Sequence, residues 1–152
     1  MNRWDMFERL FTSIIAVIQP FIIYFLNGDN HAISRAWDTP LQPLFIITNA
    51  LVSFFFFKLP KWRIPATLLL LLTSFSVTDH FILHNIFAIL FFIFSAVSLW
   101  SIKKFRYYFF IFLMSAIFLF DGLFWAETRG IITLVGYHMH LLIYRYLLEK
   151  RR

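Results

Sequence analysis

The sequence contains no cysteine, and only 14% of its 152 residues are charged. The absence of cysteine excludes disulfides, thiolate metal sites and a cysteine nucleophile. The scarcity of charge excludes a soluble domain of ordinary composition, which would need far more polar surface. Apolar residues instead make up 61% of the chain and include 22 phenylalanines. This composition predicts an integral membrane protein with a single domain, because the apolar segments take up nearly the whole length.

Six segments approach the length of about 20 apolar residues that a helix needs to cross a bilayer. The third and fourth meet in a tight hairpin at Thr78, Asp79 and His80, and prolines precede the third. These breaks argue against one long helix in this region. We therefore predict an all-α bundle of six transmembrane helices, whose spans are residues 10–27, 41–58, 64–79, 81–102, 107–126 and 130–148.

Loop charge predicts the orientation of these spans. The loops 58–63 and 103–106 each carry three bases and no acid, and only Arg35 and Arg129 among the 14 Lys and Arg residues fall in the alternate loops. The positive-inside rule therefore places both termini in the cytoplasm of a multi-pass cell-membrane protein, with the bacterial inner membrane favoured. The net charge of +6 is explained by topology and by anionic lipid head groups. Nucleic acid is not an expected partner, because no basic face with interleaved aromatics stands outside the spans.

Polar residues gather on the opposite, outer side. All five histidines fall there. A helical rise of about 1.5 Å per residue predicts that His84 lies about 6 Å deep, Asp121 about 9 Å and His138 about 10 Å. Asn49, Gln19 and His140 are expected slightly deeper. Because ionisable groups in lipid are costly and rarely without function, this layer predicts a polar pocket in the outer-leaflet half.

One interpretation of the pocket is a site that binds or modifies a lipid or lipid-linked substrate. In it, His84, Asp121 and His140 are the predicted catalytic residues, acting as acid and base or as metal ligands. His80 and His84 share one helix face, which suits a shared metal, but the glutamate of the HExxH motif is missing and the metal stays open. The expected substrate contacts are His80, Asn85, Asn49, Glu127 and Ser76.

Three other interpretations remain open. The polar groups could be interhelical hydrogen bonds that only fix packing, as in a non-enzymatic membrane subunit or scaffold. His84 and His140 could be the axial ligands of a b-type haem. An ion or proton pathway is disfavoured, because the inner halves of the spans lack a relay of acids or histidines. The expected partners are membrane lipids, with a homo-oligomer or another membrane protein as further possibilities, and His138 is assigned to a neighbouring helix or oligomer partner.

The first outer loop, residues 28–40, has two interpretations. Its turn-forming residues are typical of a solvated connector. Alternatively the segment is a lid over the polar layer, with Trp37 anchoring it at the interface.

Three short motifs occur in a characteristic order. Ile33-Ser34 is followed by Phe45 and Asn49, the fourth span reads LHNIFAILFF with His84 and Ala88, and the fifth ends FDGLFWAETRG with Glu127. This order resembles the six-helix membrane superfamily that includes the damage-regulated autophagy modulators, the GPI-anchor lipid-remodelling protein and bacterial relatives. The resemblance implies lipid-related work on the extracytoplasmic side. It maps the superfamily's His-x3-Ala onto His84 and Ala88, and its acidic residue onto Glu127. The glycine expected after the Ile-Ser pair is replaced, since Arg35 and Ala36 stand there.

Overall fold

A computed structural model describes residues 3–27, 32–117 and 122–150 of the chain. Within these ranges the secondary structure is helical and contains no strand, which confirms the predicted all-α class. The short helices are η1 (Ile33–Asp38), η2 (Pro60–Trp62) and η3 (Lys103–Phe105). The main helices are α1 (Arg3–Asn27), α2 (Gln42–Phe57), α3 (Arg63–Ser74), α4 (Phe81–Trp100), α5 (Tyr107–Ser115) and α6 (Leu123–Lys150).

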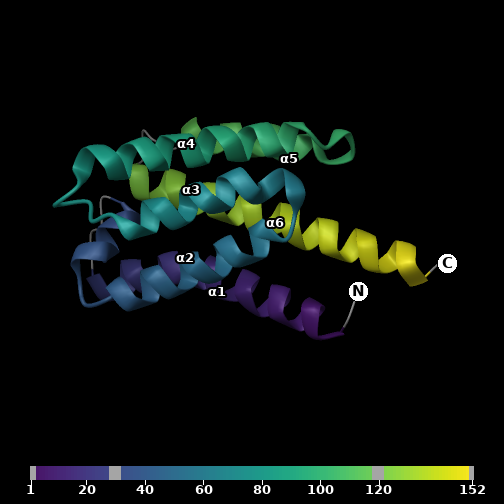
Figure 1. Cartoon of the computed structure of the whole chain (residues 1–152), viewed down its shortest axis with the longest axis horizontal. Coiled ribbons are helices and arrows are strands. Elements are labelled where there is room, and N and C mark those ends of the chain that lie inside the picture. The colour runs from purple at the N-terminus through teal and green to yellow at the C-terminus, as the bar shows by residue number, and fades with distance from the viewer. Residues whose placement is uncertain (1–2, 28–31, 118–121, 151–152) are drawn as a thin grey trace.

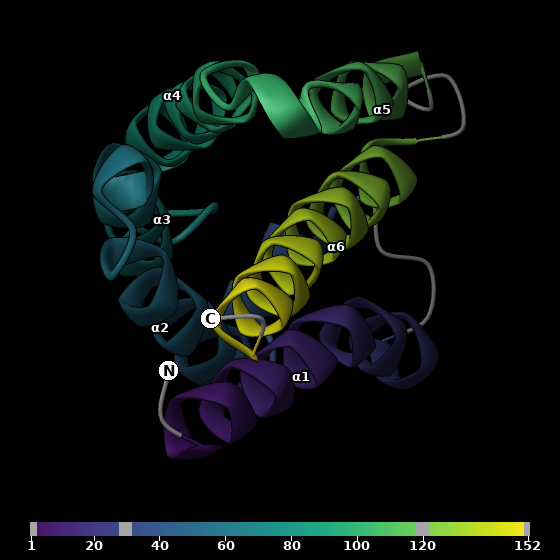
Figure 2. The same ribbon diagram turned by 90° about the vertical axis from the view of Figure 1, so that its right-hand side faces the viewer.

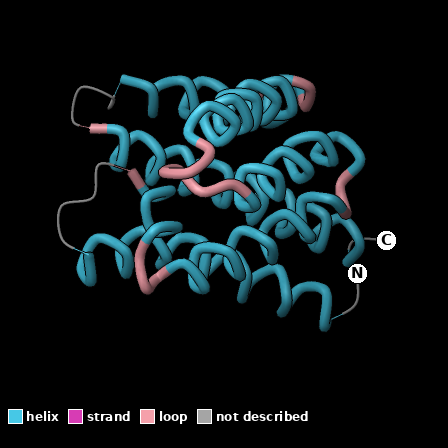
Figure 3. Tube along the Cα trace, turned by 60° about the vertical axis from the view of Figure 1, so that its left-hand side comes forward, coloured by secondary structure: helices cyan, strands magenta, loops and turns pink. Residues whose placement is uncertain are grey.

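The six main helices run up and down along one axis (Figure 1). Each packs against the next along the chain, and α6 packs against α1, so the helices form a closed ring (Figure 2). The described loops between them are short compared with the helices (Figure 3). We call the end where α1 begins and α6 ends the termini end, and the opposite end the η1 end (Figure 1).

Helices α2 and α4 agree closely with the predicted spans, but α3, α5 and α6 differ. Helix α3 ends at Ser74, because Phe75 is extended with φ −116° and ψ 127°. Gly122 has a φ of +112°, a conformation that glycine adopts readily and other residues rarely do. The chain turns there, and α6 begins at Leu123. Residues 127–129, predicted to lie in a loop, therefore lie in α6.

The ring has an apolar exterior and polar groups inside. On α4, exposed Ile82, Ile89 and Ile93 face outward, whereas His84 and Ser95 are buried. Among the described residues, three helices have stretches long and apolar enough to cross a membrane: Met6–Leu26, Phe81–Trp100 and Leu123–Leu148. Helix α2 is apolar but shorter. An apolar surface over buried polar groups is the pattern of helices that face lipid.

Two clusters of buried residues fill the interior. The larger, toward the termini end, is centred on Trp62, Leu99 and Tyr137, which are at most 1% exposed. The smaller packs Ile23 of α1 and Phe45 of α2 against η1 at the other end. Members of both clusters line the cavity described next, which therefore lies between them.

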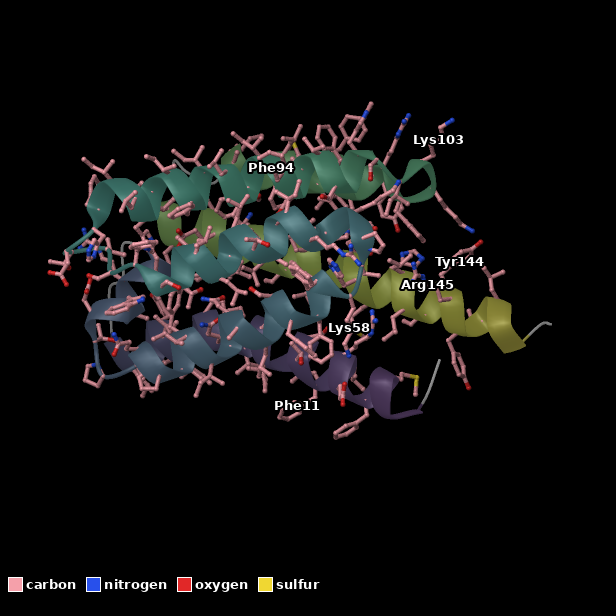
Figure 4. The ribbon with its side chains drawn as sticks, in the orientation of Figure 1. Phe11, Lys58, Phe94, Lys103, Tyr144 and Arg145 are labelled. Carbon is pink, nitrogen blue, oxygen red and sulfur yellow. The ribbon has the colours of Figure 1, made fainter. Side chains whose placement is uncertain are left out.

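The basic loops meet at the termini end. Figure 4 shows Lys58 and Lys103 there, together with Arg145 of α6. Their neighbours are aromatic: the Lys104 ammonium lies 3.6 Å from the ring centre of Tyr144, and the Arg106 guanidinium lies 4.4 Å from that of Trp100. Cation–π contacts of this kind hold basic side chains against apolar helix ends.

Candidate functional site

A cavity of about 70 Å³ lies inside the ring, with walls from α1, α2, α3, α4, α6 and η1. Most of its wall is apolar, and includes Phe45, Val52, Phe56, Leu72 and Phe91. A mostly apolar cavity with a few convergent polar groups is the usual form of a small-molecule site. The polar residues of the wall are Gln19, Ser34, Asn49, His84 and Glu127.

His84 is 2% exposed and lies in the first turns of α4. Its Nδ1 is 2.8 Å from the carbonyl oxygen of Phe75, the extended residue that ends α3. Because a carbonyl only accepts hydrogen bonds, this contact assigns a proton to Nδ1. In the neutral ring, Nε2 is then the acceptor that remains available to a ligand.

Glu127 ties η1 to α6. Its Oε2 accepts the backbone N–H of Ile33 at 2.7 Å, and the backbone N–H of Ser34 also bonds to this carboxylate. The first N–H groups of a helix have no partner inside it, so a carboxylate from another helix satisfies them. Glu127 therefore holds one edge of the cavity in place.

Three further hydrogen bonds fix η1 to the last turn of α3 and to the turn between α3 and α4. The indole N–H of Trp37 donates to the carbonyl oxygen of Thr73 at 2.7 Å. Asp38 accepts hydroxyl hydrogen bonds from Ser76 at 2.9 Å and from Thr78 at 2.6 Å. The described part of the first outer segment is thus a packed element over the cavity and not a solvated connector.

The sequence predicts that Gln19 belongs to the polar layer, but Gln19 is not among the predicted catalytic or substrate-binding residues. It is 2% exposed, and its Nε2 has no hydrogen-bond partner among the described residues. An unsatisfied buried amide costs about 1–3 kcal/mol. Asn49, only 8% exposed, lines the same cavity from α2. The signal in the sequence for Gln19 was a polar amide within a long apolar helix. A polar group in lipid is costly and rarely without function.

Three of the predicted substrate contacts lie elsewhere. The Ser76 hydroxyl bonds to Asp38 and accepts the backbone N–H of Asp79 at 3.0 Å, so it shapes the turn before α4. His80 is exposed, with its ring centre 5.5 Å from that of Phe75. The Asn85 amide donates to the Phe81 carbonyl of its own helix at 2.8 Å. None of the three lines the cavity.

The predicted catalytic set is not brought together among the described residues. His140 is exposed, and its Nδ1 lies 2.7 Å from the Tyr107 hydroxyl at the start of α5. Because α6 begins at Leu123, His140 lies about 26 Å along the helix, beside Tyr107 and toward the termini end. His84 and His140 therefore do not face each other across one cavity, as two axial haem ligands would. Asp121 lies outside the described residues.

No group of three or more His, Asp or Glu side chains is placed to hold a metal ion within residues 3–27, 32–117 and 122–150. The two histidines of the predicted pair lie in different surroundings, because His80 is exposed and His84 is buried. The described geometry provides donors and acceptors for a ligand and assigns no metal.

The fold and site define a helical bundle with membrane-span candidates and a small internal cavity that has few polar groups. Comparison of the chain with protein-family models, with curated proteins and with solved structures finds no match.

Proposed function

We propose that this protein is a multi-pass membrane protein that binds a lipid or lipid-linked substrate in the cavity beside His84. In this proposal all six predicted spans cross a bacterial inner membrane, and the termini end is cytoplasmic. The apolar exterior and the basic loops around Lys58 and Lys103 support that orientation. The cavity then belongs to the outer-leaflet half. The order of motifs around His84 and Glu127, similar to that of a lipid-remodelling superfamily, supports the choice of ligand.

The observation that carries the proposal is the unpartnered amide of Gln19 in the same apolar cavity as His84. A ligand oxygen would accept from the Gln19 amide, and a ligand hydroxyl would donate to Nε2 of His84. A cavity needs about 10–15 Å³ of such internal space to hold one water molecule. A cavity of about 70 Å³ therefore receives a small polar portion of a lipid, such as an ester or a hydroxyl, and not a whole molecule.

The same geometry suits proton transfer. The Phe75 carbonyl orients the imidazole of His84 in the way that an acceptor on Nδ1 orients a catalytic base. His84 would take a proton from a ligand hydroxyl or from water, and an enzymatic version of the proposal depends on this residue. In the rival scaffold interpretation, the contacts of His84 and Glu127 only fix the helices and η1.

Substitution of Gln19 by leucine separates the two interpretations. Leucine has a similar volume and removes the unsatisfied amide. If Gln19 is only a packing residue, Gln19→Leu raises the melting temperature and leaves bound lipid unchanged. If the proposal is right, lipid retained through purification, counted by mass spectrometry, falls roughly tenfold, which corresponds to about 1.4 kcal/mol.

Ser95→Ala is the matched control, because Ser95 is also buried with an unpartnered hydroxyl but does not line the cavity. It should retain lipid as the wild type does. Equal retention by Gln19→Leu and the wild type would overturn the binding proposal. Conversion of the retained lipid by the wild type but not by His84→Gln would assign catalysis to His84.

A further inference from the structure

A second cavity, of about 30 Å³, lies between α1, α2 and α6 on the side of the first cavity that faces the termini end. Ala16, Val52, Phe56 and Val135 line both cavities, so these apolar side chains separate the two. The polar lining of the second cavity differs from that of the first. It consists of Arg9, Thr12, Ser13 and His138.

Arg9 brings a positive charge to this cavity. Its Nε is buried and has no hydrogen-bond partner among the described residues. The adjoining carboxylate, Glu8, contacts Lys58 at 3.6 Å. A buried guanidinium N–H without an acceptor is costly, and more so than a neutral donor. None of the described residues that line the cavity is an acid that could accept from Arg9.

His138 supplies a second unpartnered atom. It was predicted to face a neighbouring helix or another subunit, and it faces the neighbouring helix α2 and lines the cavity. Its Nδ1 lies 2.8 Å from the carbonyl oxygen of Leu134, which assigns the proton to Nδ1. The ring stacks on Phe56 at 4.1 Å and meets Trp62 edge-on at 4.5 Å, so its orientation is fixed. The buried Nε2 has no partner among the described residues.

We propose that this second cavity binds the phosphate group of an anionic phospholipid from the leaflet at the termini end. A phosphate oxygen accepts from Nε of Arg9, and a hydroxyl of the phosphate or of the head group donates to Nε2 of His138. One group thereby satisfies both orphaned atoms. The site is independent of the proposed function, since it involves neither Gln19 nor His84.

A lipid phosphate is favoured over free phosphate by the remainder of the wall. Phe55, Met139 and Leu142 are apolar and belong to helices with lipid-facing exteriors. Figure 4 shows Lys58 and Arg145 toward the same end of the bundle. Basic residues near a bilayer surface attract anionic lipids, each by about 1 kcal/mol. A cavity with apolar walls and basic residues nearby suits an anion that carries acyl chains.

The test is a titration of the purified full-length chain in detergent, followed by native mass spectrometry. The probes are short-chain phosphatidic acid, phosphatidylcholine of the same chain length, and inorganic phosphate. We expect one phosphatidic acid per chain, with a Kd roughly tenfold below that of phosphatidylcholine. Arg9→Gln should raise this Kd about tenfold, and His138→Phe, which keeps the ring stacking, should raise it about fivefold.

Arg63→Gln is the matched control, because the Arg63 guanidinium lies over Phe57, 6.0 Å from its ring centre, and does not line the cavity. An equal loss in Arg63→Gln and Arg9→Gln would show diffuse surface attraction and overturn the proposal. Inorganic phosphate that binds as tightly as phosphatidic acid would overturn the lipid assignment. If Arg9→Gln does not fold, His138→Phe decides, and unchanged affinity in that variant overturns the site.

Discussion

Replacement of Glu127 by glutamine tests whether this carboxylate holds η1 over the first cavity. Its Oε2 accepts the Ile33 N–H at 2.7 Å, and the Ser34 N–H bonds to the same group. A hydrogen bond to a charged group contributes about 1.5–3 kcal/mol, and a neutral one about 0.5–1.5 kcal/mol. The loss is therefore about 1–1.5 kcal/mol for each bond, or about 2–3 kcal/mol for both.

Hydrogen exchange at Ile33 and Ser34 measures this loss directly, because these amides exchange when η1 opens. A loss of 2–3 kcal/mol corresponds to exchange roughly 30- to 150-fold faster. Glu8→Gln is the control, since Glu8 contacts Lys58 at the other end of the bundle and should leave η1 unchanged. An acceleration below about twofold in Glu127→Gln, or an equal one in Glu8→Gln, would refute the idea that the carboxylate anchors η1.

The other predictions concern packing. Gly122→Ala should lower the free energy of unfolding by about 1–2 kcal/mol, because φ is +112° there, and chemical unfolding in mixed micelles would measure it. Trp37→Phe removes the donor to the Thr73 carbonyl and should speed exchange across η1 about two- to tenfold, and unchanged exchange would argue against this contact. Leu99→Ala should cost about 2–5 kcal/mol, because Leu99 is fully buried, whereas Ile93→Ala on the exterior should cost less than about 1 kcal/mol. Equal costs in the same unfolding assay would contradict the assignment of inside and outside.

Much of the fold was predictable because two signals are local in the sequence. They are the length of each apolar segment, and the prolines and polar residues that interrupt it. Helices α2 and α4 begin and end within a few residues of their predicted spans. The start of α6 was missed, because the sequence alone does not show that Gly122 turns the chain and that polar Glu127 continues the helix. Charged residues near the start of a helix, such as Glu127 and Arg129, look like a loop when only hydropathy is considered. The number of spans and their orientation stay predictions.

The candidate site was predictable only in part. His84, Asn49 and Glu127 were all predicted as site residues, and they line one cavity. Their roles stay predictions. The position of His140 depended on the start of α6, which puts it beside Tyr107 and toward the termini end. The orphaned atoms of Arg9 and His138 could not be predicted, because the absence of a partner depends on tertiary packing and not on residue type.

The closed ring has a consequence for biosynthesis. The Ile33 N–H and its acceptor on Glu127 are 94 residues apart, and α6 is the last of the described helices to be made. At about 5–20 residues per second, a ribosome produces the two groups roughly 5–19 s apart. In the proposed membrane arrangement, α1 is inserted during that delay, before α6 completes the wall of the cavity that Gln19 lines. We expect the nascent chain to depend in this interval on the insertion machinery, and truncation before α6 to leave a product that quality-control proteases degrade.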